Sequence, residues 1–338
     1  MATPRITMIS RGTANPDIIE QQWAGLEYDL DTYECRSPGE AIEAIKGADI
    51  IINQGVPMPR EVIRQIDQAQ AIVSFGHGFN HIDHDAATEQ GVMIVNCAGF
   101  CTEEVSNHAI MLLLACAKKL TTLNNLVKTG KWDAQLRQVM LPMVPIDGQM
   151  LGLVGFGNIG RATARKAKVF GLEVIAHDPY VHPWIAKEYR VALVPTLEEL
   201  ARRSDFVSMH TPLNNETRKL IGASFFKAMK PTAYFINTCR GPTVDEAALI
   251  KALQDDEIAG AGLDVFEVEP TPADNPLLKM DNVIVTPHSA GTSSRSRIAA
   301  QVQIGQETAR LLKGTRPMSV VNPDVLAKLP PRPVAVNV

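Results

Sequence analysis

The sequence predicts an α/β protein with two doubly wound parallel-sheet domains joined by long crossing helices. Three observations lead to this fold class. Short apolar runs alternate with helical patterns through the first hundred residues, and a second alternating series occupies residues 151–287. Two long helical patterns, at 102–120 and 292–312, interrupt the alternation. Strands that alternate with helices are typical of parallel sheets, because each parallel connection needs a crossover and the helices then cover both faces.

The first series predicts a sheet of short strands separated by helices. Apolar runs of strand length are bounded by turn residues, and Gly47 and Gly91 each follow a helical pattern that they are suited to end. The expected strands are 6–10, 49–53, 71–75 and 92–95, and the expected helices are 17–23, 38–46, 60–66 and 83–90.

The segment 102–120 predicts a single buried helix that crosses between the domains. Glu103 and Glu104 fall in its first turn and Lys118 and Lys119 in its last, an order that complements the helix dipole. Residues 97–100 are the expected hinge before it, and 129–147 is less regular. A second long helix, stopped by Gly314, is expected to return the chain to the first domain.

The second series predicts a larger sheet and a discontinuous first domain. Its expected strands are 151–154, 174–178, 206–210, 233–238, 260–265 and 283–286, and the helix 161–170 is stopped by Gly171. We therefore expect a first domain of residues 1–100 plus 292–330 and a second of 101–291. The proline-rich tail beyond Pro317 is expected to be extended or loose.

Composition excludes several classes of protein. The 338 residues carry a net charge of −4 without a block of like charges, so we expect neither a nucleic-acid partner nor a membrane surface. The longest apolar run, 109–117, is shorter than the roughly 20 residues that span a bilayer. The 5 cysteines show no zinc-ligand spacing, which predicts reduced thiols and no metal. With no secretory signal at the start, we expect a cytoplasmic protein.

Residues 151–160 predict a dinucleotide site. A short apolar strand runs into Gly155, Gly157 and Gly160 at the G-x-G-x-x-G spacing, which allows a tight turn, a close approach to pyrophosphate and close helix packing. The helix N-terminus adds N–H groups and partial positive charge. Asp178 ends the next strand, where a carboxylate accepts hydrogen bonds from ribose. Its charge favours NAD over NADP, although His177 or a nearby arginine could moderate that preference.

Four groups just past strand ends have the chemistry for hydride transfer. Arg240 can present a planar fork to a carboxylate, and His288 can transfer a proton near neutral pH. The acidic residues after 260–265 include Glu269, and Gly76-His77-Gly78 offers backbone N–H groups to a small anion. Each alone has an ordinary explanation as a surface turn or a solvated loop. Together they supply a cation, a proton donor and a carboxylate beside a nicotinamide.

The chain resembles the D-isomer-specific 2-hydroxyacid dehydrogenase family from about residue 50 to residue 322. The motifs that carry this resemblance are Val-Gly-Phe-Gly-Asn-Ile-Gly-Arg at 154–161, His-Thr-Pro-Leu at 210–213, Asn-Thr-Cys-Arg-Gly at 237–241, Gly-Leu-Asp-Val-Phe-Glu-Val-Glu-Pro at 262–270 and Thr-Pro-His at 286–288. The resemblance implies a flavodoxin-like substrate-binding domain and an NAD-binding Rossmann domain, which close over a cleft, and a homodimer.

The resemblance also implies residue roles. Arg240 would bind and polarise the substrate, His288 would act as the acid and base, and Glu269 would hold His288 protonated until needed. Gly76, His77, Gly78 and Arg240 would bind the substrate. The implied cofactor-binding residues are Thr102, Gly155, Gly157, Asn158, Ile159, Gly160, Asp178, His210, Thr211, Pro212, Thr238, Cys239, Arg240, Asp264 and His288.

The leading hypothesis is an NAD(H)-dependent enzyme acting on a small D-2-hydroxy acid or 2-keto acid, with glyoxylate and hydroxypyruvate as first candidates. Oxidation of 3-phosphoglycerate is an alternative, disfavoured because 53–55 reads Asn-Gln-Gly where such relatives often carry arginines, although Arg60 is close. Ser74, Asn80 and Asn107 also depart from the common family pattern. A second alternative is an NAD-sensing protein like the corepressors built on this fold, disfavoured because the chain lacks long partner-binding extensions.

Overall fold

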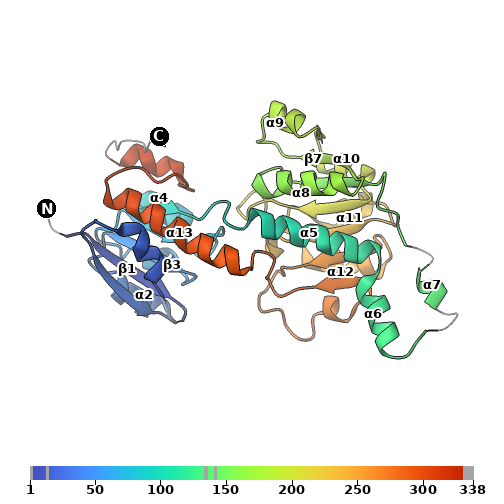
Figure 1. Cartoon of the computed structure of the whole chain (residues 1–338), viewed down its shortest axis with the longest axis horizontal. Helices are drawn as coiled ribbons and strands as arrows, with labels where there is room; N and C mark the ends of the chain where they lie inside the picture. The colour runs from blue at the N-terminus through green and yellow to red at the C-terminus, as the bar shows by residue number, and fades with distance from the viewer. Residues whose placement is uncertain (1–2, 13–14, 133–135, 141–142, 330–338) are drawn as a thin grey trace. The chain divides into compact units, whose positions relative to one another are not determined.

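The structure, a computed structural model, describes residues 3–12, 15–132, 136–140 and 143–329. The chain forms two compact units (Figure 1). Unit 1 comprises the described residues up to Cys101 and those from Ser293 onward, and unit 2 is Thr102–Thr292. The chain leaves unit 1 once and returns to it, so unit 1 is discontinuous in sequence. Each unit has its own sheet and core and is described by itself.

Within its described residues, unit 1 contains a 5-stranded parallel sheet in the order β2-β1-β3-β4-β5, which is the flavodoxin-like order. The strands are β1 (Arg5–Ser10), β2 (Asp29–Glu34), β3 (Ile50–Gln54), β4 (Ala71–Ser74) and β5 (Met93–Val95). The helices are α1 (Asp17–Glu20), α2 (Pro38–Ile45), α3 (Arg60–Ile63), α4 (His84–Gln90) and α13 (Ser294–Leu312), with 3-10 turns at Gln21–Trp23 and Pro323–Lys328. Buried apolar clusters cover both faces of the sheet.

Helix α13 belongs to unit 1 because it packs against α1 and against β3 and β4. Figure 1 shows it in orange-red beside the blue strands. The indole Nε1 of Trp23 donates a 2.9 Å hydrogen bond to the Gly305 carbonyl oxygen. A Cβ at Gly305 would lie 2.6 Å from the carbonyl oxygen of Ile19, so this close helix contact requires glycine.

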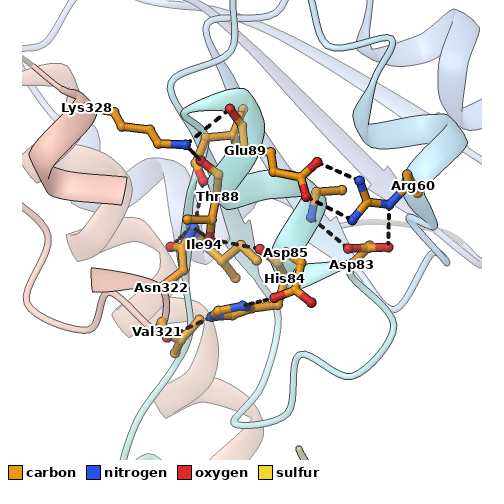
Figure 2. A network of polar contacts seen from close by, with 12 residues as sticks. Arg60, Asp83, His84, Asp85, Thr88, Glu89, Ile94, Val321, Asn322 and Lys328 are labelled. Carbon is orange, nitrogen blue, oxygen red and sulfur yellow. Dashed lines mark hydrogen bonds and ion pairs between the residues drawn. The ribbon is translucent and has the colours of Figure 1, made fainter. Parts of the chain in front are cut away.

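The expectation of a loose tail beyond Pro317 is wrong for residues 318–329. Val320 forms an antiparallel bridge with Val95, and the Asn322 side chain accepts a 2.8 Å hydrogen bond from the Ile94 N–H. Figure 2 shows the contact between Asn322 and Ile94 together with that of Lys328, whose Nζ donates to the Thr88 carbonyl oxygen at 2.9 Å. The unpaired edge of β5 explains the difference, because its backbone groups bind this segment. Residues 330–333 lie outside the described part of the chain.

Within its described residues, unit 2 contains a 7-stranded parallel sheet in the order β12-β11-β10-β9-β6-β7-β8. The strands are β6 (Met150–Val154), β7 (Glu173–His177), β8 (Ala192–Leu193), β9 (Phe206–Met209), β10 (Tyr234–Asn237), β11 (Gly260–Leu263) and β12 (Val283–Val285). The order reverses between β6 and β9, which is where ligands bind in open sheets of this kind.

The helices of unit 2 are α5 (Thr102–Ala117), α6 (Leu120–Lys128), α7 (Leu136–Met140), α8 (Asn158–Val169), α9 (Pro183–Glu188), α10 (Leu197–Arg203), α11 (Ala223–Ala228) and α12 (Glu246–Gln254). There are 3-10 turns at Gly241–Thr243 and Pro276–Lys279. Helix α5 packs against α8, β10 and β11, so most of its apolar side chains are buried in unit 2.

The observed helix α5 is shorter than the helix predicted at 102–120. It ends at Ala117, and Lys119, with φ of 50°, turns the chain by 61° into α6. Among the described residues no single helix has the length and apolar composition to cross a membrane, and the bent pair α5–α6 meets those two criteria only when its halves are joined. Helix α8 in turn begins at Asn158, three residues earlier than expected.

Candidate active site

The glycine-rich turn between β6 and α8 is a tightly packed phosphate-type loop. Gly155 has φ of +92°, and a Cβ there would lie 2.8 Å from the His210 carbonyl oxygen. A Cβ at Gly160 would lie 2.4 Å from the Gly155 carbonyl oxygen, whereas one at Gly157 would meet nothing within 4 Å. Gly155 and Gly160 are therefore required by packing, while Gly157 leaves open space at the helix N-terminus, where an anion is favoured.

Asp178, just past the end of β7, braces this turn. Its Oδ2 accepts a 2.8 Å hydrogen bond from the Phe156 N–H. Its Oδ1 accepts hydrogen bonds from the N–H groups of Tyr180 at 2.9 Å and Val181 at 3.1 Å. The carboxylate predicted to meet a ribose thus lies beside the glycine turn, in the arrangement that dinucleotide-binding sheets use.

Polar groups without a protein partner lie at the ends of β9 and β10. Among the described residues, neither the buried Nδ1 of His210 nor the buried Oγ1 of Thr238 has a hydrogen-bond partner. Burial lowers the pKa of His210 to about 3, so the ring is neutral near pH 7. Buried polar groups are normally paired. A ligand that enters at these strand ends would supply the missing partners, which fits the predicted nicotinamide side of a cofactor.

Asn237 shapes the turn that carries Arg240. Its Oδ1 accepts a 3.0 Å hydrogen bond from the Cys239 N–H, and its Nδ2 donates to the Arg240 carbonyl oxygen at 3.2 Å. Thr243 Oγ1 donates to the same carbonyl at 2.6 Å. A Cβ at Gly241 would lie 1.8 Å from the Phe266 carbonyl oxygen, so glycine allows this turn to pack directly against the segment that carries Glu269.

Glu269 and His288 form a hydrogen-bonded carboxylate–imidazole pair. Glu269 Oε2 lies 2.7 Å from His288 Nδ1, and Glu269 Oε1 accepts a 2.9 Å hydrogen bond from the Phe266 N–H. Partial burial raises the pKa of the Glu269 carboxyl, but hydrogen bonds from His288 and Phe266 and the charge of Arg240 outweigh burial and hold that pKa below its usual value. The other ring nitrogen of His288, Nε2, makes no hydrogen bond to any described residue.

The segment around Glu269 has its own support. Glu246, the first residue of α12, accepts a 2.8 Å hydrogen bond from the Glu267 N–H and another, also 2.8 Å, from Asn275 Nδ2. Neither Glu246 nor Asn237 is among the site residues predicted from the sequence. The strand-end position of Asn237 pointed to the site, but nothing in the local pattern of α12 marked Glu246.

The Gly76-His77-Gly78 turn lies in unit 1, after β4. Gly76 has φ of +105°, and its carbonyl oxygen accepts a 2.9 Å hydrogen bond from the Cys97 N–H. Asn96 Nδ2 donates to the His77 carbonyl oxygen at 2.7 Å. The N–H groups of Gly76 and Gly78 donate to no other described residue, so these two amides are available to a small anion.

The structure places the predicted residues of unit 2 in groups. Asn158 and Ile159 open α8 beside the glycines; Thr102 opens α5; Thr211 and Pro212 follow β9; Cys239 lies in the Arg240 turn; and Asp264 follows β11. These strand ends lie on one edge of the unit 2 sheet, as parallel pairing requires. Within the described ranges no group of three or more His, Cys, Asp or Glu residues is arranged to hold a metal ion.

Comparison with known proteins decides the family. The model of the D-isomer specific 2-hydroxyacid dehydrogenase, NAD binding domain, matches residues 110–290. The chain belongs to this family. It is an oxidoreductase that transfers a hydride between a nicotinamide cofactor and a 2-hydroxy or 2-keto acid. The glycine turn, the unpartnered Thr238 hydroxyl and the Glu269–His288 pair are consistent with this chemistry.

The dehydrogenase is similar to several named proteins. It is 37% identical over 308 residues to a glyoxylate reductase of Korarchaeum cryptofilum, covering 90% of this chain and 92% of the relative. It is 36% identical to a D-3-phosphoglycerate dehydrogenase of Methanocaldococcus jannaschii, covering 84% of this chain but 53% of that one. A Sinorhizobium meliloti NADPH-dependent glyoxylate/hydroxypyruvate reductase, solved with NADP and malonate, superposes with a TM-score of 0.82 at 29% identity, covering 99% of this chain and 100% of that one.

Proposed function

We propose that this dehydrogenase reduces small 2-keto acids, glyoxylate and hydroxypyruvate first among them, with NADH. The observation that carries the proposal is the 2.7 Å contact between Glu269 and His288 Nδ1, close enough to Arg240 for the guanidinium to lower the Glu269 pKa. A proton donor, its charged partner and a cation therefore lie together in unit 2.

Each group has a distinct part in the proposed reaction. Arg240 binds the substrate carboxylate and draws electron density toward the carbonyl oxygen. When bound, a nicotinamide cofactor would supply the hydride that reduces the carbonyl carbon. His288 Nε2 would give the proton to the carbonyl oxygen, so a keto acid would become a hydroxy acid. Glu269 orients the imidazole and stabilises its charge. In the oxidative direction, Nε2 accepts the hydroxyl proton.

Unit 1 favours a small, unphosphorylated substrate. Asn53 is buried, and its side chain forms hydrogen bonds of 2.8 and 2.9 Å with the backbone of Val56. Arg60, the nearest cation in sequence, is paired with Glu89 at 2.6 Å and lies 3.7 Å from Asp83 (Figure 2). A phosphate would have to compete with these carboxylates. The two available amides of Gly76 and Gly78 suit a lone carboxylate.

The preference for NAD rests on Asp178. Its carboxylate is fixed by three backbone N–H groups at the end of β7. Pro179, Tyr180 and Val181 follow it, so none of the next three residues offers a cation to a 2′-phosphate. A negative charge at this position repels that phosphate and accepts hydrogen bonds from the free ribose hydroxyls.

We also propose a homodimer that acts in the cytoplasm. Met111 and Leu120 are 47% and 60% exposed and border a hollow of about 500 Å³ along α5. Contiguous exposed apolar side chains are typical of association surfaces. All five cysteines are free thiols, which suits a reducing compartment.

The test is oxidation of NADH and of NADPH by the purified enzyme with a panel of 2-keto acids. We expect the highest kcat/KM with glyoxylate or hydroxypyruvate, and NADH preferred by at least about tenfold, equivalent to ~1.4 kcal/mol. Turnover restricted to large or aromatic keto acids would contradict the substrate assignment. A preference for NADPH would contradict the role given to Asp178.

Oxidation of 3-phosphoglycerate is a second candidate, favoured by the similarity to the M. jannaschii enzyme. The same preparation assayed with 3-phosphoglycerate and NAD tests this candidate. Robust turnover would support it and would mean that a phosphate binds near Arg60 although Arg60 is already paired. A protein that binds NADH tightly but turns over neither keto acids nor 3-phosphoglycerate would instead support the NAD-sensing alternative.

A further inference from the structure

Asp264 is the centre of a hydrogen-bonded cage around the turn that carries His288. The carboxylate is fully buried. Its Oδ1 accepts hydrogen bonds from Thr286 Oγ1 at 2.6 Å and from the Ser289 N–H at 2.9 Å, and its Oδ2 accepts one from the Ala290 N–H at 2.9 Å. Its carbonyl oxygen accepts the His288 N–H at 2.8 Å. One residue thus binds both sides of the turn.

The cage holds His288 in a conformation that its own backbone disfavours. His288 has φ of 51°, in the left-handed region. For a residue with a Cβ this conformation is unfavourable, so surrounding contacts must maintain it. In that conformation the imidazole meets Glu269 at 2.7 Å. The geometry of the proposed acid–base pair therefore depends on how firmly Asp264 and Thr286 are held.

His108 completes the cage from helix α5. Its Nε2 lies 2.9 Å from Thr286 Oγ1 and 3.6 Å from Asp264 Oδ1, and its side chain is 15% exposed. The Thr286 hydroxyl has one hydrogen, and it donates this hydrogen to the Asp264 carboxylate. At Thr286 Oγ1 the remaining interaction must be an accepted hydrogen bond, so His108 carries a proton on Nε2 and donates it.

We propose that His108 is a positioning residue for the reaction. Through Thr286 and Asp264 it keeps the His288 turn in its left-handed conformation, so that the imidazole stays in line with Glu269. The inference rests on the proposed role of His288. His108 itself contacts neither His288 nor Glu269 in the described structure, so any effect on the reaction must travel through Thr286 and Asp264.

The matched variants are His108→Leu, which removes the donor at similar volume, and His108→Gln, whose amide keeps a donor on a flexible side chain. We expect His108→Leu to lower kcat for keto-acid reduction about tenfold with KM changed less than about twofold, and His108→Gln to recover most of the loss. Thr286→Val should reproduce the loss, and Thr286→Ser should not. The Thr286 pair keeps the test available if His108→Leu does not fold.

A double-mutant comparison separates positioning from general destabilisation. In a His288→Gln background, where the acid is already lost, His108→Leu should cost less than about twofold in kcat. An equal tenfold loss in both backgrounds, or unchanged kcat in His108→Leu with His288 intact, would overturn the inference. A fully active His288→Gln enzyme would instead overturn the proposed function, so the two failures are distinguishable.

Discussion

The two oxygens of Glu269 have different partners, and this asymmetry links the local backbone to the chemistry. Oε1 is bound to the Phe266 N–H and Oε2 to His288 Nδ1. The first contact fixes the carboxylate relative to its own loop, and the second fixes the tautomer of the imidazole, leaving Nε2 to exchange a proton with the substrate. The lowered pKa of Glu269 keeps it ionised down to pH values below its usual range.

Glu269→Gln tests this pairing. The amide keeps the size of the side chain but removes the negative charge that favours protonated imidazole. We expect the alkaline limb of the pH–rate profile for keto-acid reduction to move to lower pH, with little change in affinity for NADH. The matched control is Glu267→Gln. Glu267 is a nearby carboxylate that lies 3.3 Å from Lys219 Nζ and does not pair with His288. An unmoved alkaline limb would show that Glu269 does not charge the acid.

His210 predicts a pH dependence of stability. Its folded pKa of about 3 lies below the unfolded value of 6.5, so the unfolded chain binds an extra proton between those values. Stability is therefore lost as pH falls through this window, by at most about 1.4 kcal/mol per pH unit. Urea unfolding at pH 7 and pH 5 should show a smaller loss in His210→Gln than in the wild type. His182→Gln controls for the removal of an imidazole; identical losses in all three proteins would refute the assignment.

At the scale of elements, the turn between β6 and α8 separates packing from ligand binding. A Cβ at Gly160 would meet the Gly155 carbonyl oxygen at 2.4 Å, whereas a Cβ at Gly157 would meet nothing within 4 Å. The same motif thus contains two glycines that the fold needs, Gly155 and Gly160, and one, Gly157, that only a ligand would need.

Gly160→Ala and Gly157→Ala are therefore a matched pair. We expect Gly160→Ala to lower Tm by several degrees, because the backbone of the turn must shift. Gly157→Ala should keep the wild-type Tm and weaken NADH binding at least about tenfold, because the added methyl occupies the space predicted for pyrophosphate. Thermal unfolding and fluorescence titration with NADH measure both quantities. Equal Tm losses in the two variants would contradict the distinction.

Apolar patterning predicted the buried strands well but not the exposed elements. Strand β2 (Asp29–Glu34) was missed because its residues are largely exposed and its sequence, Asp-Leu-Asp-Thr-Tyr-Glu, has no buried face. It forms by pairing with β1, a long-range contact that no local pattern contains. The break at Lys119 was likewise missed, because Lys118 and Lys119 also suit the last turn of a continuous helix.

Candidate site residues could be named from the sequence where a residue follows a strand or belongs to a known motif, as Gly155, Asp178, Arg240 and His288 do, and their roles stay predictions. His108 was not predictable in this way. It lies in an apolar helix, 178 residues before Thr286, and its contact exists only after α5 packs against the rest of unit 2. Supporting residues of this kind come from tertiary packing.

At the scale of the whole molecule, each sheet is parallel and each unit has its own core. In unit 2, parallel pairing gathers the residues that follow β6, β7, β9, β10, β11 and β12 at one sheet edge, although they are spread from Gly155 to His288. This is why short motifs far apart in sequence predict a single site. Because the chain returns to unit 1 through α13, unit 1 depends on residues from both ends of the described sequence.

The proposed homodimer is testable through its exposed apolar surface. Met111→Glu and Leu120→Glu place charges beside the α5 hollow, so burial in a dimer would become costly. We expect the double variant to have the mass of one chain in light scattering, while the wild type has that of two. Val169→Glu, at a residue 84% exposed on α8, is the control. A wild-type monomer, or a dimer unaffected by both charges, would contradict this surface assignment.

Keto-acid reduction by His288→Gln under saturating NADH tests the proposed acid–base pair most directly. If His288 donates the proton and Glu269 holds the imidazole in place, kcat should fall by on the order of 10²–10⁴-fold, the usual contribution of a general acid. The affinity for NADH, measured by titration, should change little. A His288→Gln enzyme that reduces glyoxylate or hydroxypyruvate at the wild-type rate would contradict the central claim that the Glu269–His288 pair carries the reaction.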